Sequence, residues 1–220
     1  GLAASTLSLA STVLYSNPDR AGTLLAEAET QLVNQLKALP NLAEVSKLLA
    51  TVRANMGILD LTRKDARSAK THVESAIQLH TEARHAFPHD PQIPPELARD
   101  YLLLAMISVE LGDPDGARSA AESLAQVTPE DVFGHIQAAA QIARAVQLVK
   151  DAQSADASTR DKHVADLTTA AVSHLRETRR LDPKAIGPAA LDFPFFAPLK
   201  GQAAFEAFRK ELSEKKPAAR

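Results

Sequence analysis

The stretch PELARDYLLLAMISVELGDPDGARSAAESLAQVTP, residues 95–129, decides the fold class. Apolar residues recur at helical spacing on both sides of Gly112, which predicts two amphipathic helices joined by a tight turn. Gly112 suits the left-handed position that follows a helix, and Asp113 and Pro114 are typical of the cap and first residue of the next helix. Small residues lie on the facing sides of both predicted helices, so the two helices can approach each other closely.

The second helix of this hairpin has related copies elsewhere in the chain. In each copy an alanine is followed by an apolar or small residue four positions later, and the copies begin at Ala21, Ala69, Ala117 and, more loosely, Ala171. These starting positions lie 48, 48 and 54 residues apart. A small residue, Gly57, precedes Ala69 by the twelve residues that also separate Ala105 from Ala117. Four helical hairpins at near-constant spacing predict a stacked α-solenoid.

The hairpin at 95–129 resembles a tetratricopeptide repeat (TPR). The residues that carry this resemblance are Tyr101, Leu104, Ala105, Gly112, Ala117, Ala121, Leu124 and Pro129. It implies an all-α, right-handed α-solenoid of about four TPR-like hairpins over residues 1–183. Residues 184–220 are expected to form an apolar linker, a capping helix and a disordered basic tail. The spacing exceeds the roughly 34 residues of standard TPR units, so an armadillo or HEAT array with a period of ~40–47 is the alternative.

Breaker residues and apolar periodicity predict where the helices begin and end. Leu39-Pro40-Asn41 should interrupt the chain, and residues 153–161 should form a polar loop. The helices are expected at about 2–15, 19–38, 42–61, 65–87, 95–111, 114–128, 130–152, 162–181 and 202–213.

Composition and motif content remove several classes of function. The 220 residues contain no cysteine, which excludes disulfides and Cys-based zinc sites. Charge is balanced, with 25 Lys and Arg against 27 Asp and Glu, so no nucleic-acid partner is expected. No apolar run reaches the ~18–20 residues of a membrane span. Phosphate loops and the common catalytic motifs are missing from the sequence, so we expect a non-catalytic protein without a cofactor.

The resemblance to TPR proteins also implies a binding groove. In such units the first helix of each hairpin lines the groove, here at Arg99, Leu102, Met106 and Val109, and one repeat earlier at Thr51, Ala54, Ile58 and Leu61. These residues are mostly apolar and lack the Lys, Asn and Arg clamp with which some family members hold a peptide carboxylate. The predicted partner is therefore a protein or peptide with an apolar or helical segment. The same residues could instead pack between neighbouring hairpins.

Two side-chain clusters carry alternatives. His80, His85 and His89 are weak candidates for a metal site, because two of them have i,i+4 spacing; the alternative is a polar last turn in which His meets the helix dipole. Five of the seven phenylalanines fall within residues 191–212, where they can cap the last hairpin or form an exposed docking surface.

Two longer segments, residues 48–117 and LDFPFFAPLKGQAAFEAFRKEL at 191–212, resemble the repeat region that follows the kinase domain in planctomycete-type bacterial Ser/Thr protein kinases. This resemblance implies an interaction or sensor module of a bacterial signalling protein. Because the chain starts at Gly1, we expect it to be a fragment with the kinase domain upstream. Its compartment is left open: cytoplasmic or, after a transmembrane segment, periplasmic. The alternatives are a metal- or small-ligand-binding sensor and a purely structural or homodimerisation arm.

Overall fold

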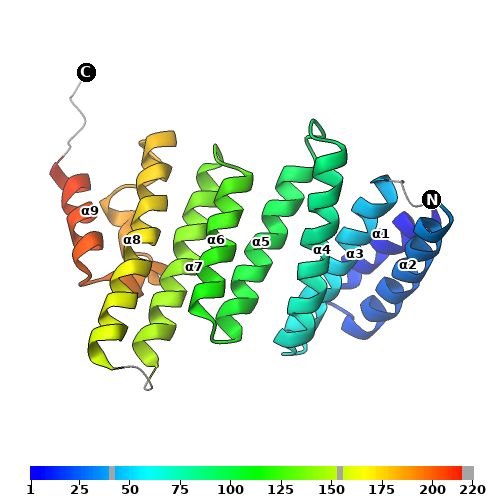
Figure 1. Ribbon diagram of the computed structural model, residues 1–220, viewed down its shortest axis with the longest axis horizontal. Coiled ribbons are helices and arrows are strands. Elements are labelled where there is room, and N and C mark those ends of the chain that lie inside the picture. Colours follow the sequence, from blue (N-terminus) through cyan, green and yellow to red (C-terminus); the bar gives the residue numbers. More distant parts are fainter. Residues whose placement is uncertain (40–42, 153–155, 215–220) are drawn as a thin grey trace. The chain divides into compact units, whose positions relative to one another are not determined.

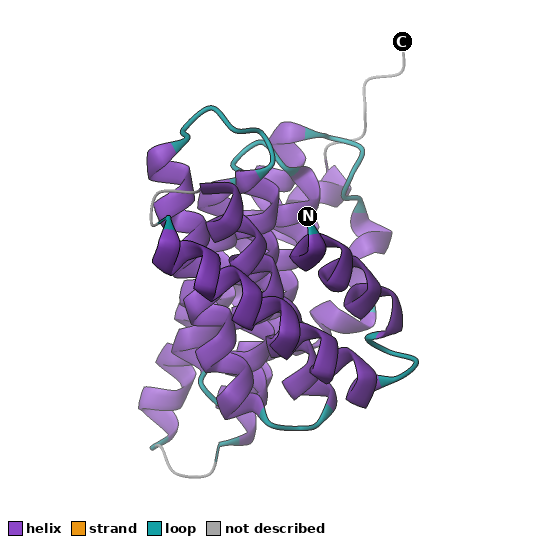
Figure 2. Cartoon of the chain, turned by 90° about the vertical axis from the view of Figure 1, so that its right-hand side faces the viewer, coloured by secondary structure: helices purple, strands orange, loops and turns teal. Residues whose placement is uncertain are grey.

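The computed structural model describes residues 1–39, 43–152 and 156–214 of the chain. Within these ranges the protein consists of nine α-helices and two 3-10 helices, without a strand (Figures 1 and 2). The expected all-α fold is therefore confirmed. The elements are α1 (Leu2–Val13), α2 (Pro18–Ala38), α3 (Ala43–Thr62), α4 (Ala66–Ala86), α5 (Ile93–Glu110), α6 (Pro114–Val127), α7 (Val132–Asp151), α8 (Ala157–Leu181), η1 (Pro188–Asp192), η2 (Pro194–Leu199) and α9 (Ala203–Glu214).

The chain divides into two compact units, residues 1–107 and 108–220, and the division falls inside α5. In the first unit α2 packs against α1 and α3, and α3 packs against α4. In the second unit α7 packs against α6 and α8, η2 packs on α7, and α9 packs on α8 (Figure 1). Helices adjacent in sequence thus pack in pairs, as the hairpin pattern predicts. The division expected after residue 183 stays a prediction, and the expected disordered tail lies largely outside the described residues.

The second helices of the first three hairpins begin in the same way. Asn17, Asp65 and Asp113 precede α2, α4 and α6, and they are spaced 48 residues apart. Each side chain accepts a hydrogen bond from the backbone N–H three residues later, at 3.1, 3.0 and 2.8 Å. Such a cap satisfies one of the N–H groups that a helix start leaves unpaired. The 48-residue period therefore repeats a structural device as well as an apolar pattern.

The turns before two of these caps are also equivalent. Gly112 has a φ of 70°, as the sequence predicts, and Lys64, 48 residues earlier, adopts a φ of 62°. Glycine takes this left-handed conformation freely, whereas a side chain makes it costly. Lys64 therefore holds a turn that suits glycine better.

Close helix approach explains the small residues of the pattern. Ala21, Ala69, Ala117 and Ala171 are all fully buried. At Gly57 on α3, an added Cβ would lie 2.5 Å from Val73 Cγ2 and 3.2 Å from the Ala69 carbonyl oxygen, both on α4. Glycine is therefore favoured where these two helices touch, since any larger residue would force a neighbour to move.

In the first unit, hydrogen bonds join first helices of successive hairpins. Asn55 on α3 donates to Ser11 Oγ on α1 at 3.0 Å, and its carbonyl oxygen accepts from Arg99 Nη2 on α5 at 3.3 Å. Both steps span 44 residues. Because Asn55 is buried, these bonds also satisfy polar groups that burial would otherwise leave unpaired.

Two sequence predictions need correction. Helix α8 begins at Ala157, five residues before the expected start at 162, because the Asp156 side chain accepts from the Thr159 N–H and hydroxyl. The expected linker at 184–201 contains η1 and η2, whose Leu191 and Leu199 are fully buried. The predicted opening of α5 at Pro94 and Pro95 is confirmed within one residue, because the helix starts at Ile93 and both prolines lie in its first turn. Most of the expected break at 39–41 lies outside the described residues.

The phenylalanine cluster near the C-terminus has a buried part and an exposed part, and its role as a docking surface stays a prediction. Phe196, Phe205 and Phe208 are almost completely buried, which is the packing expected of a cap on the α7–α8 hairpin. Phe193 and Phe195 remain 53% and 40% exposed and stack on each other with ring centroids 5.5 Å apart. The C-terminal segment thus covers the hairpin while leaving two aromatic rings in solvent.

Candidate functional site

The predicted groove residues of the first unit lie on two adjoining stripes. On α3, Thr51, Asn55 and Ile58 are spaced by four and three residues and therefore lie on one side of the helix. On α5, Arg99 and Leu102 are three residues apart and likewise share a side. Because Asn55 and Arg99 are hydrogen-bonded, the two stripes adjoin. We call the partly exposed residues Thr51, Ile58, Leu102 and Met106 the α3–α5 face.

Three further predicted groove residues have different surroundings. Ala54 is fully buried and packs near Ala50 and Ala76, so it supports the face from beneath. Val109, which belongs to the second unit, is also buried. Arg99 is partly exposed and, besides Asn55, pairs with Glu96 at 3.6 Å. Whether these residues bind a partner stays a prediction.

A cavity of about 430 Å³ opens in the first unit beside the α3–α5 face, and we call it the His80 cavity. Its volume falls within the ~300–1,000 Å³ typical of ligand pockets. Thr51 belongs both to the face and to the cavity wall. The lining residues come from α3, α4, the loop before α5 and the first turn of α5; they are Glu44, Lys47, Leu48, Thr51, His80, Pro91, Gln92, Ile93, Pro95 and Glu96.

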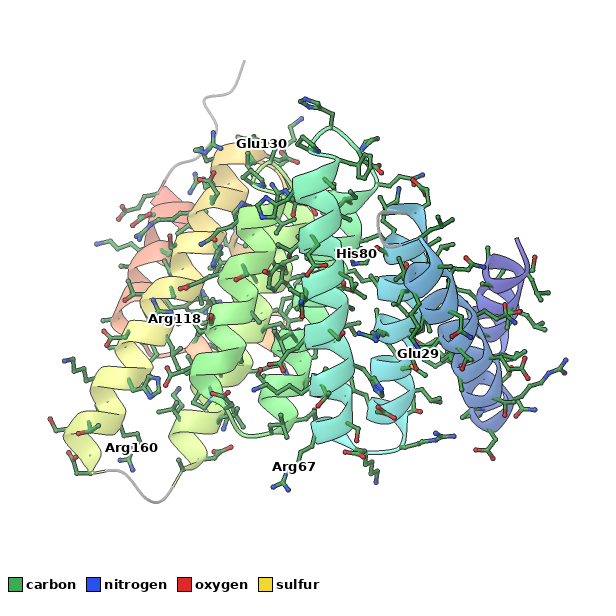
Figure 3. All side chains as sticks on the ribbon, turned by 45° about the vertical axis from the view of Figure 1, so that its right-hand side comes forward. Glu29, Arg67, His80, Arg118, Glu130 and Arg160 are labelled. Atoms are coloured by element: carbon green, nitrogen blue, oxygen red, sulfur yellow. The ribbon has the colours of Figure 1, made fainter. Side chains whose placement is uncertain are left out.

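The most buried polar group of this wall is His80, on α4 (Figure 3). Its Nδ1 lies 2.7 Å from Asp100 Oδ2, and the two residues are 1% and 0% exposed. Burial raises the pKa of the Asp100 carboxyl above its usual range, while the hydrogen bond to His80 acts in the opposite direction. Since Nδ1 is used by Asp100, Nε2 is the ring nitrogen left for the cavity.

The rim of the cavity is rich in carboxylates. Lys47 Nζ pairs with Glu44 at 2.7 Å and with Asp90 at 2.6 Å. The hydrogen bond to Asp90 is the main cause that raises the pKa of Lys47, followed by the bond to Glu44. The same Lys47–Asp90 bond lowers the pKa of Asp90. Glu96 Oε2 is a buried atom without a hydrogen-bond partner within the described part of the chain. Arg99 Nε, a donor, is also buried without a partner in the described part of the chain, but Arg99 does not line the cavity. Among the lining residues, the carboxylates of Glu44 and Glu96 outnumber the single cation, Lys47.

The remaining two candidate histidines do not join His80. His85 and His89 are exposed, whereas His80 is buried against Asp100. Among the described residues, no three His, Asp or Glu side chains gather in a way that could hold a metal ion. The three histidines are thus neighbours in sequence only.

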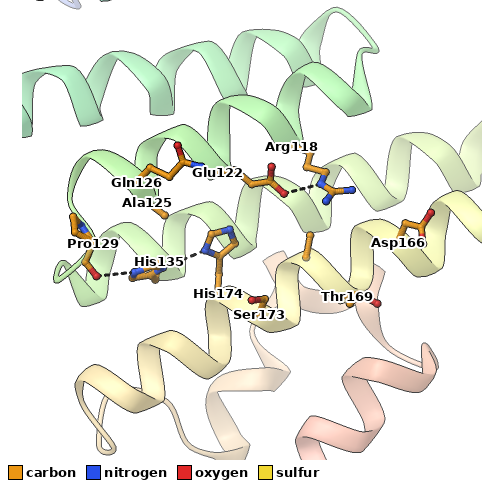
Figure 4. Close-up of a pocket in the computed structure, with 11 residues that line it drawn as sticks. Arg118, Glu122, Ala125, Gln126, Pro129, His135, Asp166, Thr169, Ser173 and His174 are labelled. Atoms are coloured by element: carbon orange, nitrogen blue, oxygen red, sulfur yellow. Dashed lines mark hydrogen bonds and ion pairs between the residues drawn. The ribbon is translucent and has the colours of Figure 1, made fainter. Parts of the chain in front are cut away.

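A second cavity, of about 640 Å³, lies in the second unit between α6, α8 and the start of α7 (Figure 4). Its wall contains a chain of hydrogen bonds through His135 and His174. His135 Nε2 lies 3.0 Å from the Pro129 carbonyl oxygen, and its Nδ1 lies 3.1 Å from His174 Nδ1. Because a carbonyl only accepts, His135 Nε2 carries the proton, its Nδ1 accepts from His174 Nδ1–H, and His174 Nε2 is left as an acceptor.

In this pair, the surroundings of His174 disfavour its charged form. Burial, followed by the neighbouring His135, lowers the pKa of His174 from 6.5 to about 4. Arg118 acts in the same direction, and Glu122 and Glu177 oppose it. Arg118 and Glu122 are themselves paired at 2.7 Å across one helical turn. The cavity thus presents a neutral histidine beside a balanced ion pair.

Sequence reasoning missed both buried histidine pairs. His80 and Asp100 are 20 residues apart and His135 and His174 are 39 apart, on different helices in each case. The available signal was that Asp100 and His135 fall among the apolar positions of otherwise buried helix faces, where a polar residue needs a partner.

Comparison with known proteins does not place the chain in a family. No protein-family model matches it, and no curated protein is significantly similar to it. The resemblances to TPR proteins and to bacterial kinases therefore stay predictions. None of the described helices combines the length and the apolar character needed to cross a membrane.

Proposed function

We propose that this chain is a non-catalytic interaction module that binds a helical or apolar segment of a partner protein on the α3–α5 face. The proposal rests on Thr51, which belongs both to this face and to the wall of the His80 cavity and so makes the two surfaces continuous. Ile58, Leu102 and Met106 supply partly exposed apolar surface, and the cavity supplies a recess at its end. Peptide-binding grooves of helical proteins combine apolar anchors with a few directed polar groups in this way.

Rigid support beneath the face favours binding over simple packing. Ala54 is buried below it, and the Asn55–Arg99 hydrogen bond holds α3 and α5 in register. A surface that is held in place before binding loses less entropy when a partner docks. As part of the same proposal, the hairpins continue as a right-handed α-solenoid with α9 as its cap.

We also propose a context for this module in a longer protein. The resemblance of residues 48–117 and 191–212 to kinase-associated repeats suggests a signalling protein with a kinase domain elsewhere in the full-length chain. The reading frame upstream of Gly1 tests this directly: a kinase domain there supports it, and an unrelated domain contradicts it. This outcome does not affect the binding proposal for the α3–α5 face.

The binding proposal is tested by crosslinking. A photoreactive residue is placed at Ile58, and crosslinked proteins are compared between the otherwise unchanged chain and the double variant Leu102→Asp and Met106→Asp. The control is Leu111→Asp, which also adds a charge at an exposed leucine but lies in the turn after α5. We expect the double variant to lose the crosslinked partner and the control to keep it.

Two outcomes would contradict the proposal. Unchanged crosslinking by a double variant with wild-type circular dichroism would show that the face is not used. If the crosslinked species is a second copy of this chain, and sedimentation shows a dimer that the double variant loses, the protein is a homodimerisation arm instead.

A further inference from the structure

We propose that the His80 cavity receives a basic side chain, the guanidinium or ammonium group of an arginine or lysine in the bound segment. This inference rests on the proposed function, since it assigns a side chain to the segment that the α3–α5 face binds. Thr51 lies in both surfaces, so a segment on the face reaches the cavity without crossing another element.

Unused acceptors are the first argument. Among the described residues, Glu96 Oε2 is a buried atom without a hydrogen bond, and its nearest cation, Arg99 Nη1, lies at 3.6 Å. His80 lines the cavity, and its Nδ1 is the ring nitrogen that is hydrogen-bonded, to Asp100. A buried acceptor without a partner costs free energy, so a group that donates several hydrogen bonds is favoured here. Guanidinium has five donors and ammonium has three.

Charge balance is the second argument. Lys47 is the cation of the cavity wall, and it is already paired with both Glu44 and Asp90. Glu96 adds one further carboxylate, and Arg99 adds one cation. Three carboxylates thus stand against two fixed cations around this cavity, and the buried Asp100 is hydrogen-bonded to His80. The residual field favours a cation over an anion at the site.

The shape and chemistry of the wall provide the third argument. Apolar side chains of Leu48 and Ile93 and the rings of Pro91 and Pro95 line the cavity beside the polar groups. Arginine and lysine carry an apolar stem below the charged group, so each part of such a side chain meets a matching part of the wall. A carboxylate-bearing side chain would meet the same apolar wall but would face the surplus of acceptors.

Nuclear magnetic resonance titration of the whole chain tests the inference with small probes. Butylguanidinium carries the proposed group on an apolar stem; butylurea has nearly the same shape without the charge, and butyrate reverses the charge. We expect butylguanidinium to shift the His80 ring signals saturably, with a Kd on the order of 1–10 mM for so small a ligand. Butylurea and butyrate should bind at least about tenfold more weakly.

Two isosteric variants localise the effect. Glu96→Gln should weaken butylguanidinium binding about tenfold, because a charge-assisted hydrogen bond is replaced by a neutral one. Glu82→Gln removes a carboxylate from an exposed position on α4 that does not line the cavity, and it should leave the Kd unchanged.

The inference is overturned if the His80 signals do not move at about 50 mM probe, five times the upper expected Kd. It is also overturned if butylurea or butyrate binds as well as butylguanidinium, a comparison that needs no variant. The Leu102→Asp and Met106→Asp variant should still bind butylguanidinium. If this double variant leaves crosslinking unchanged while butylguanidinium still binds, the proposed function fails and the cavity chemistry stands. If the double variant abolishes crosslinking but butylguanidinium does not bind the wild-type chain, this inference alone fails.

Discussion

Replacing Gly57 by alanine tests the packing of α3 against α4. The new Cβ would lie 2.5 Å from Val73 Cγ2, whereas ordinary carbon–carbon contacts are about 3.5–4.0 Å. Val73 is fully buried and β-branched, so it has little freedom to move away. Overpacking of this kind costs about 1–3 kcal/mol, and a 2.5 Å contact with a fully buried side chain belongs to the upper half of that range, about 2–3 kcal/mol. The better helix propensity of alanine returns about 1 kcal/mol. We therefore expect Gly57→Ala to lower the free energy of unfolding by about 1–2 kcal/mol.

A double-mutant cycle in urea unfolding, followed by circular dichroism, isolates the contact. Val73→Ala alone should cost about 1–2 kcal/mol through lost burial, yet it removes the methyl group that the new Cβ would meet. The double variant should then be at least about 1 kcal/mol more stable than the sum of the single effects predicts. Gly22→Ala is the matched control, because its Cβ would meet the flexible Leu59 side chain at 3.3 Å. Strictly additive effects, or a Gly57→Ala variant as stable as the wild type, would refute the steric reasoning.

Three further predictions concern single residues. His174 takes up a proton near its ordinary pKa of 6.5 in the unfolded chain and near 4 in the folded chain, so the free energy of unfolding should fall by about 3 kcal/mol as the pH drops across this window. In His174→Gln the urea midpoint should depend less on pH between 7 and 4. A midpoint that falls with pH as steeply as in the wild type would contradict the assignment. Asp113→Ala should cost about 1 kcal/mol of unfolding free energy by removing the α6 cap, whereas Asp113→Asn should cost less. Lys64→Gly should raise the thermal midpoint, because relief of a left-handed side chain (about 1–2 kcal/mol) exceeds the added backbone entropy (about 0.5–1 kcal/mol); a lower midpoint would show that Lys64 is stabilised in another way.

The sequence was most informative where local chemistry decides the structure. Gly112, Asp113 and Pro114 predicted a turn, a cap and a helix start, and the structure has all three. These features depend on residues within a few positions of one another. The start of α8 was misplaced because Asp156 and Thr159 form a local cap inside a stretch that is polar enough to suggest a loop.

The candidate site was less predictable, because it depends on how helices are rotated against one another. The stripe Thr51, Ile58, Leu102 and Met106 could be proposed from register alone. The pairing of His80 with Asp100 could not be predicted in this way, since Asp100 lies on another helix and neither residue belongs to a recognised motif. A small rotation of α5 would separate the two side chains without altering the apolar pattern of either helix.

The Ser11–Asn55–Arg99 chain of hydrogen bonds has a consequence for how the hairpins are ordered. The three residues occupy equivalent places 44 residues apart, yet they are chemically different: a hydroxyl that accepts, an amide that donates and accepts, and a guanidinium that only donates. Duplicating the hairpin that carries Arg99 would place two guanidinium groups, which only donate, at one junction, whereas Ser11 and Asn55 can each donate and accept. Arg99 therefore needs a neighbour that offers an acceptor, and this need restricts the order in which the hairpins can follow one another.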